Sequence, residues 1–572
     1  MGSCLSSDMK PEELSVFKDL PPETLLDVIE IPERAEHRKP TDRRFIIVYA
    51  VAVALLLPFM IYTMCFADSS RLLSFYDECG NSCGIKNSKH EDVACSGKDL
   101  TDKPYMMFEG HNDPTRNDGW LSKPRSCVQT CPAGYNPIFN ICIASDKDDS
   151  IDYIMKVGLF LKNEAWRIVF SCFVSIGVAI GVVVLYRTAT KAMVYTTLIV
   201  VSLLTIVGVI LLWVSVASTP LNAGTMTFAI VLTVLLVFFL CVLIFLRKKI
   251  GLVIALLQEA MKTVFDLPQL LMVPVLTFLA QLVLVCLFLT TLAYMLTAGI
   301  LTPLDGYLGD YYYYELTMVM KFTHYYNFAI YLWTSQIIVG IQYMVIAGAV
   351  AKWYFAKNKK LLDRPLRTSV FVTFLYHLGS IVMGSLIIII VMIVRSLISA
   401  AIRNRVIRAC VDALLRPIER FLKYLTKNAY IVIAMHGKPF CKSGKRGGKI
   451  ILDNAINVVA INFIGDFILA MAQLTIVFIS MIFTFAIMQG AHSLNNDDVS
   501  EYVAYGIVFL FSLMAAVTAF SVFETVIDSL FICFCEDSLM NDGMARPYAM
   551  SRELMEFLDN AKTVFVKKKN SD

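Results

Sequence analysis

The chain has 572 residues, of which 57% are hydrophobic and only 17% are charged, and its mean hydropathy is +0.63. A soluble globular domain carries about 25% charged residues. The composition therefore excludes a soluble protein and indicates a polytopic membrane protein, with the lipid bilayer as its first partner. The formal net charge of +4 is small, so it gives no reason to expect a nucleic acid as partner.

The amino-terminal segment, residues 1–44, is rich in proline and charge and has no sustained apolar period, which predicts a disordered lead. It opens with a myristoylation pattern at Gly2, and Cys4 beside it offers a site for palmitate. A chance match of so short a pattern is the alternative. Arg43 and Arg44 border the first apolar run, so the positive-inside rule predicts a cytosolic amino terminus.

An outer domain is expected after the first span. That span covers residues 45–66, and the hydrophilic block that follows, 67–165, should lie outside the cell. The block contains six cysteines: Cys79, Cys83, Cys95, Cys127, Cys131 and Cys142. On the oxidising side they predict up to three disulfides, whose connectivity the sequence leaves open. A zinc site is the alternative, but the CxxxC spacing and the few histidines fit it poorly.

A transmembrane bundle is expected over residues 166–535, followed by a basic cytosolic tail, 536–572. The chain has nine apolar runs, whereas two cytosolic termini require an even number of crossings. The conflict falls at 368–394, because the strongly basic segment 396–449 behind it also belongs inside. Either 368–394 is broken or re-entrant, or a further crossing is hidden after it. The basic segment is expected to contain an amphipathic helix on the inner surface.

The apolar run 324–353 differs from ordinary membrane filler. At helical spacing one face collects five residues: Trp333, Gln336, Gly340, Tyr343 and Ala347. Two interpretations remain open and are compatible. The face is a helix–helix seam, where small residues allow close approach and the amide forms an interhelical hydrogen bond. Alternatively, it is a wall of a polar, aromatic cavity inside the bundle.

Ionisable residues within apolar runs are expensive in a membrane, so they mark either a pathway or a partner. His377 lies in the run 368–394, and Glu524 and Asp528 lie one helical turn apart in the last apolar run. A structural hydrogen bond for the histidine, and a position near the membrane edge for Asp528, are the alternatives to a direct role.

Several of these stretches resemble the choline-transporter-like protein family. The motifs that carry the resemblance are Leu332-Trp333-Thr334, Ile346 to Phe355, Tyr376 to Ser380, Asn428 to Cys441 and Val526 to Asp537. The outer-loop cysteine motifs, Asp77 to Gly84 and Cys127 to Pro132, are similar to those of the family as well.

The resemblance implies an all-α fold with about ten transmembrane helices and a disulfide-rich extracellular loop domain. It further implies transport of choline or a related quaternary amine, independent of sodium and often linked to protons. A quaternary ammonium has no N–H donor, so it is recognised by aromatic faces. The expected substrate-binding residues are Tyr331, Trp333, Gln336 and Tyr343. The expected residues for proton or cation coupling are His377, Glu524 and Asp528.

The second hypothesis is a plasma-membrane receptor or interaction protein that acts through the outer domain. An enzyme is disfavoured, because the sequence has no nucleophile elbow, phosphate loop or cluster of metal ligands. We therefore expect no cofactor and no metal. Oligomeric state, coupling ion and direction of transport cannot be read from the sequence.

Overall fold

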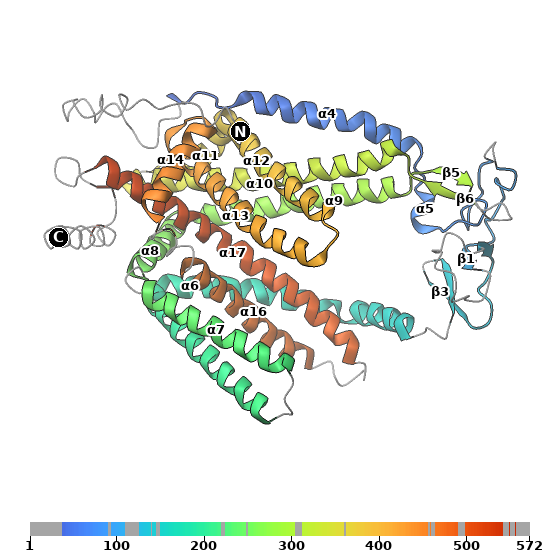
Figure 1. Cartoon of the computed structure of the whole chain (residues 1–572), viewed down its shortest axis with the longest axis horizontal. Coiled ribbons are helices and arrows are strands. Elements are labelled where there is room, and N and C mark those ends of the chain that lie inside the picture. Colours follow the sequence, from blue (N-terminus) through green and yellow to red (C-terminus); the bar gives the residue numbers. More distant parts are fainter. Residues whose placement is uncertain are drawn as a thin grey trace.

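The fold is described from a computed structural model of the whole chain, and the description covers residues 37–89, 93–108, 125–138, 140–144, 149–218, 223–246, 250–303, 312–359, 362–455, 458, 464–489, 498–541, 548–549 and 555. Long helices form one bundle, and all strands gather at one end of it (Figure 1). We call this the outer end and the opposite one the inner end. The start of the first helix and the end of the last both lie at the inner end (Figure 1). Gly2 and Cys4 lie outside the described residues.

Helices dominate, as expected for a polytopic membrane protein. The long ones are α4 (Arg43–Cys65), α6 (Asp149–Ser218), α7 (Ala223–Leu246), α9 (Met272–Leu296), α10 (Met318–Phe355), α12 (Leu378–Ala401), α13 (Arg405–His436), α16 (Asp466–Gln489) and α17 (Asp498–Met540). In the described part of the chain, seven helices are long and apolar enough to cross a bilayer. Two shorter apolar stretches, 205–214 and 229–238, add to them. The predicted all-α membrane fold is confirmed, and the count of about ten is an approximation.

Three helices shape the inner end. The amphipathic α8 (Ile250–Asp266) and the short turn η5 (Pro268–Leu271) precede α9, and α14 (Phe440–Asp453) follows α13. Helix α6 contains a kink at Ala189, whose backbone angles are not helical. The chain turns back there, so α6 contributes two consecutive rods rather than one (Figure 1).

The helix pair α12–α13 covers the part of the chain where the charge pattern and the number of crossings disagree. The start of α12 is bonded to the end of α13, because the Tyr430 hydroxyl donates to the carbonyl of Ile381 at 3.1 Å. The end of α12 is bonded to the start of α13, because the Ser399 hydroxyl donates to Asp412 at 2.5 Å. The two helices therefore run antiparallel along their length. The run before α12 is irregular, because α11 (Pro365–Val372) passes into a π-helical turn, Thr373–His377. The further crossing after this run stays a prediction.

The outer domain contains a four-stranded sheet in the order β2-β1-β4-β3. Its strands are β1 (Tyr105–Phe108), β2 (Arg125–Val128), β3 (Tyr135–Ile138) and β4 (Ile141–Ala144), and a short helix, α5 (Ser70–Leu73), precedes them. Three disulfides close this domain, Cys79–Cys95, Cys83–Cys127 and Cys131–Cys142. The disulfide prediction is thus confirmed.

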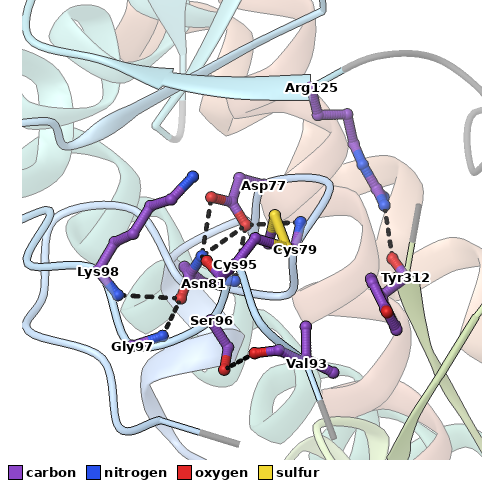
Figure 2. Close-up of a disulfide and its surroundings, with 10 residues drawn as sticks. All are labelled: Asp77, Cys79, Asn81, Val93, Cys95, Ser96, Gly97, Lys98, Arg125 and Tyr312. Carbon is purple, nitrogen blue, oxygen red and sulfur yellow. Dashed lines mark hydrogen bonds between the residues drawn. A yellow bond between two sulfur atoms is a disulfide. The ribbon is translucent and has the colours of Figure 1, made fainter. Parts of the chain in front are cut away.

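The Asp77 carboxylate organises the turn around the first disulfide (Figure 2). Its Oδ1 accepts hydrogen bonds from the backbone amides of Cys79 and Asn81 at 2.9 and 2.7 Å. The Asn81 amide oxygen in turn accepts from the backbone N–H of Gly97 at 2.8 Å. These bonds satisfy buried polar groups in a domain too small to have a large apolar core.

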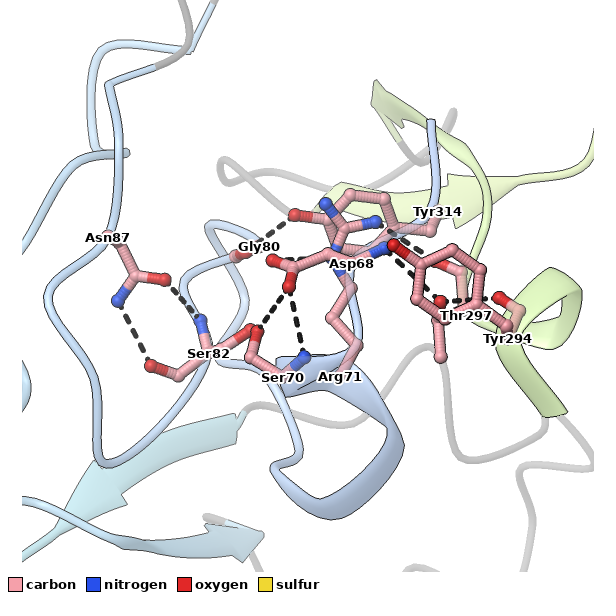
Figure 3. A network of polar contacts seen from close by, with 9 residues as sticks. All are labelled: Asp68, Ser70, Arg71, Gly80, Ser82, Asn87, Tyr294, Thr297 and Tyr314. Carbon is pink, nitrogen blue, oxygen red and sulfur yellow. Dashed lines mark hydrogen bonds and ion pairs between the residues drawn. The ribbon is translucent and has the colours of Figure 1, made fainter. Parts of the chain in front are cut away.

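A two-stranded hairpin, β5 (Ile300–Pro303) and β6 (Tyr312–Glu315), connects the outer domain to the bundle. The Arg71 guanidinium lies 3.8 Å from the ring centre of Tyr314 and donates to the carbonyl of Thr297 at 3.1 Å. The Tyr314 hydroxyl donates to the carbonyl of Gly80 at 2.8 Å, as Figure 3 shows. Burial raises the pKa of Tyr314, so this hydroxyl stays a donor.

Close helix approach in the bundle depends on glycine. A Cβ atom added at Gly340 would lie 2.7 Å from Cγ2 of Ile381. One added at Gly384 would lie 2.5 Å from the Tyr430 hydroxyl and 2.7 Å from the ring of Phe440. Small residues at helix contacts are typical of membrane bundles, so the seam interpretation of the 324–353 face accounts for Gly340.

We expect Gly384→Ala to destabilise the folded protein by about 1–3 kcal/mol, because the added methyl overpacks the contact between α12 and α13. Thermal unfolding of the detergent-solubilised protein measures this. Gly506→Ala is the matched control, since a Cβ there meets no atom within 4 Å. Equal melting temperatures for the two variants would contradict the packing argument.

Candidate functional site

Two of the expected substrate-binding residues point to different neighbours. The Trp333 indole is buried between α4 and α12, where it donates to the carbonyl of Val382 at 3.3 Å and meets the Tyr49 ring edge-on at 5.1 Å. The Tyr331 ring stacks on Phe288 of α9 at 4.4 Å. The structure therefore does not bring these two rings into one cage.

The other two expected residues lie deeper along α10, and both are half-buried. In the described part of the bundle, the Gln336 amide has no hydrogen-bond partner. Tyr343 does have a partner, because the Lys427 ammonium of α13 lies 4.8 Å from the centre of its ring. An ammonium over an aromatic face is a cation–π contact. The aromatic residue expected to receive a cation thus already faces one.

Lys427 also connects the two expected acidic residues. Its ammonium lies 2.7 Å from Glu524 Oε1 and 2.7 Å from Asp528 Oδ2, both on α17. Lys427 and Asp528 are buried, whereas the Glu524 side chain is 47% exposed. Asp466, at the start of α16, interacts electrostatically with all three groups. We call Lys427, Tyr343, Glu524, Asp528 and Asp466 the middle ionic layer.

A second ionic layer closes the inner end. The Glu536 carboxylate is fully buried and receives two hydrogen bonds from the Arg446 guanidinium of α14, at 2.5 and 2.6 Å. The His436 Nε2 atom lies 3.2 Å from the same carboxylate. The adjacent Asp537 accepts from the Tyr354 hydroxyl of α10 at 3.1 Å. This inner ionic layer joins α10, α13, α14 and α17.

The two layers follow from the parallel course of α13 and α17. Lys427 precedes His436 by nine residues, and Asp528 precedes Glu536 by eight. At 1.5 Å per residue the layers are about 12–14 Å apart on both helices. Charged partners therefore meet at two matched levels.

His377 belongs to a third polar group, away from the expected acidic partners. It is fully buried in the π-helical turn and is covered by the segment that precedes α4. Arg38 Nη1 lies 3.1 Å from His377 Nε2, and Arg38 Nη2 donates to the carbonyl of Ala434 at 2.6 Å. Thr41 Oγ1 lies 3.0 Å from His377 Nδ1 and 2.7 Å from Ser380 Oγ.

The hydrogen-bond directions in this group follow from the two residues at its ends, Arg38 and Asp42. Arginine only donates, so His377 Nε2 must accept, and the imidazole is neutral with its proton on Nδ1. The Asp42 carboxylate accepts from the Ser380 hydroxyl at 2.6 Å and from the backbone N–H of Phe440 at 2.8 Å. We call residues 38–42, with these bonds, the amino-terminal latch. Protonation of His377 at Nε2 requires Arg38 to withdraw.

The structure also has a cavity of about 880 Å³ that none of the expected site residues lines. It lies between the kink of α6 and helix α8, and its charged lining residues are Arg187, Lys191, Glu259, Lys262 and Asp266. None of its lining residues belongs to the middle ionic layer.

Sequence reasoning missed Lys427, Arg446, Glu536, Asp537 and the latch. A signal for Lys427 existed, because it directly precedes the apolar run 428–435, with no other basic residue between it and His436. Because Lys427 lies in a strongly basic segment, it was interpreted with its neighbours as a cytosolic residue. Glu536 and Asp537 end the motif Val526 to Asp537, but the sequence did not indicate which residues they pair with.

A family model described as "Plasma-membrane choline transporter" matches residues 230–539. This is more than half of the chain. The chain belongs to this family.

Relatives of the choline transporter family extend the similarity over nearly the whole chain. Choline transporter-like protein 3 of Bos taurus is 27% identical over 606 residues, which covers 91% of this chain and 92% of that protein. Choline transporter-like protein 1 of Torpedo marmorata is 27% identical over 624 residues, covering 92% and 94%. Choline transporter-like protein 2 of Dictyostelium discoideum is 31% identical over 342 residues, covering 58% and 53%. Both ionic layers of this choline transporter family member lie within the range of the family model.

We expect Arg38→Ala to release the amino-terminal latch, since it removes charged hydrogen bonds to His377 and Ala434. Such bonds contribute about 1.5–3 kcal/mol each. Amide hydrogen exchange of residues 376–380 should accelerate by about tenfold or more. Lys39→Ala is the control, because Lys39 is exposed. Unchanged exchange in the Arg38 variant would mean that the latch does not hold the π-helical turn.

Proposed function

We propose that this protein carries choline or a related quaternary amine across the plasma membrane, with both termini in the cytosol. The membership in the choline transporter family supports this proposal. The single observation that carries it in the molecule is the middle ionic layer, in which an aromatic ring and a buried carboxylate already hold a cation.

The chemistry of this layer suits a quaternary ammonium. The trimethylammonium group cannot donate N–H hydrogen bonds, so its binding depends on an aromatic face and on long-range attraction to carboxylates. Tyr343 offers the face, and Asp528 offers a carboxylate buried beside it. Tyr331, Trp333 and Gln336 then act by supporting α10 against its neighbours. We assign direct contact with substrate to Tyr343 alone among the four.

A proton link, where it operates, is proposed to act through His377. The imidazole accepts from Arg38, and proton uptake there would break the amino-terminal latch. The latch precedes α4 and joins it to α12, α13 and α14, because Asp42 accepts from Ser380 and Phe440 and Arg38 donates to Ala434. A change of protonation would therefore alter how the inner ends of four helices are joined. Glu524 and Asp528 remain the proposed residues for cation coupling in the middle ionic layer.

The first test is uptake of radiolabelled choline into vesicles that contain only the purified protein. Tyr343→Leu should raise the KM for choline by about tenfold or more, because a desolvated cation–π contact is worth about 2 kcal/mol. Tyr343→Phe keeps the ring and serves as the control, with a KM close to that of the unaltered protein. An unchanged KM in the leucine variant would remove Tyr343 from the substrate site.

The proton link has its own measurement. Choline uptake should respond to an imposed pH gradient in the unaltered protein, and His377→Gln should remove the response because glutamine does not titrate. Uptake without a gradient should persist in this variant. A gradient response that survives the substitution would exclude His377 as the titrating group.

A further inference from the structure

The Lys427 ammonium occupies the position that a substrate cation would need. It touches the Tyr343 ring and the carboxylates of Glu524 and Asp528 at the same time. Both Lys427 and Asp528 are buried. At the middle ionic layer, a side chain of the protein therefore occupies this position.

The charges of the layer exceed what one lysine neutralises. Two carboxylates, of Glu524 and Asp528, pair with a single fixed cation. A buried carboxylate without a partner is expensive in a membrane bundle. The layer therefore has the capacity for one further monovalent cation, provided that each buried carboxylate keeps a partner.

Lysine can leave the buried position without losing its own partner. Its four-carbon stem is flexible and its ammonium has three rotatable donors. Glu524 is half exposed and Asp466 is exposed, so both can hold the ammonium nearer the edge of the layer. Asp528 is the one carboxylate that needs a replacement cation when the lysine turns away, since it is buried.

We propose that Lys427 is a tethered competitor of the transported cation. The inference rests on the proposed function. In the empty carrier the Lys427 ammonium neutralises Asp528 and packs on Tyr343. A quaternary ammonium displaces it toward Glu524 and Asp466, and the return of the lysine expels the substrate on the other side. Lys427 thereby allows the empty carrier to reset, because Asp528 is paired at every stage.

This role predicts that a substitution of Lys427 affects net uptake of choline but not exchange of internal for external choline. Without the lysine, the empty carrier would have to reset with Asp528 buried and unpaired, whereas the loaded carrier would not. Lys427→Met should therefore lower net choline uptake by about tenfold or more and keep exchange of internal for external choline. The same variant should bind choline at least about tenfold more tightly, because its competitor is gone. Lys423→Met is the matched control on α13, since Lys423 pairs with Glu419.

A second variant covers the case in which Lys427→Met does not fold. Lys427→Arg keeps the charge, and the guanidinium can grip a carboxylate through two parallel hydrogen bonds. The arginine should be displaced less easily, so choline affinity should fall by about tenfold or more in a folded protein. Equilibrium binding of radiolabelled choline measures it, with melting temperature as the folding check.

The outcomes separate this inference from the proposed function. Absence of both uptake and exchange in the unaltered, folded protein would refute choline transport itself. Normal transport in the unaltered protein, with net uptake and exchange reduced equally in Lys427→Met, would give the lysine a merely structural role. Unchanged choline affinity in Lys427→Arg would also overturn the competitor role and leave the proposed function standing.

Discussion

An ammonium group buried inside an apolar bundle must be neutralised where it lies, and much of this structure is arranged around that requirement. Lys427 is buried, and its partners come from a different helix, α17. The pairing fixes the register of α13 against α17, because a shift by one residue would separate the charges. Removal of one partner from a buried pair costs about 3–5 kcal/mol. The same fixed register aligns His436 with Glu536 at the inner end.

Composition and cysteine spacing were sufficient to predict the class of fold. Apolar runs long enough to cross a bilayer became helices such as α4 and α9, and the six outer cysteines formed three disulfides. The connectivity, in contrast, depends on which loops meet in space. Cys83 pairs with Cys127, which lies 44 residues further along the chain. The residues around each cysteine do not indicate which distant cysteine it will meet.

The helix α13 was the hardest element to place from sequence. Its first half is basic and amphipathic, which is typical of a helix on a membrane surface. Its second half, from Thr426 to Met435, is buried among four helices. Partners on neighbouring helices make this basic helix compatible with the interior: Asp528 of α17 pairs with Lys427, and Arg395 of α12 pairs with Glu419 of α13. Trp333 illustrates the opposite case, because a residue that suits a cation cage was used for packing.

Helix α10 has a mechanical consequence for the whole molecule. Its 38 residues make a rod of about 57 Å, longer than the hydrocarbon core of a bilayer. The rod starts directly after the hairpin that anchors the outer domain, and near its other end Tyr354 is bonded to Asp537. A hydrogen-bonded helix resists compression, so a push on the outer domain must displace the inner end or bend the rod. Helix α10 thus couples the disulfide-bonded domain mechanically to the inner ionic layer.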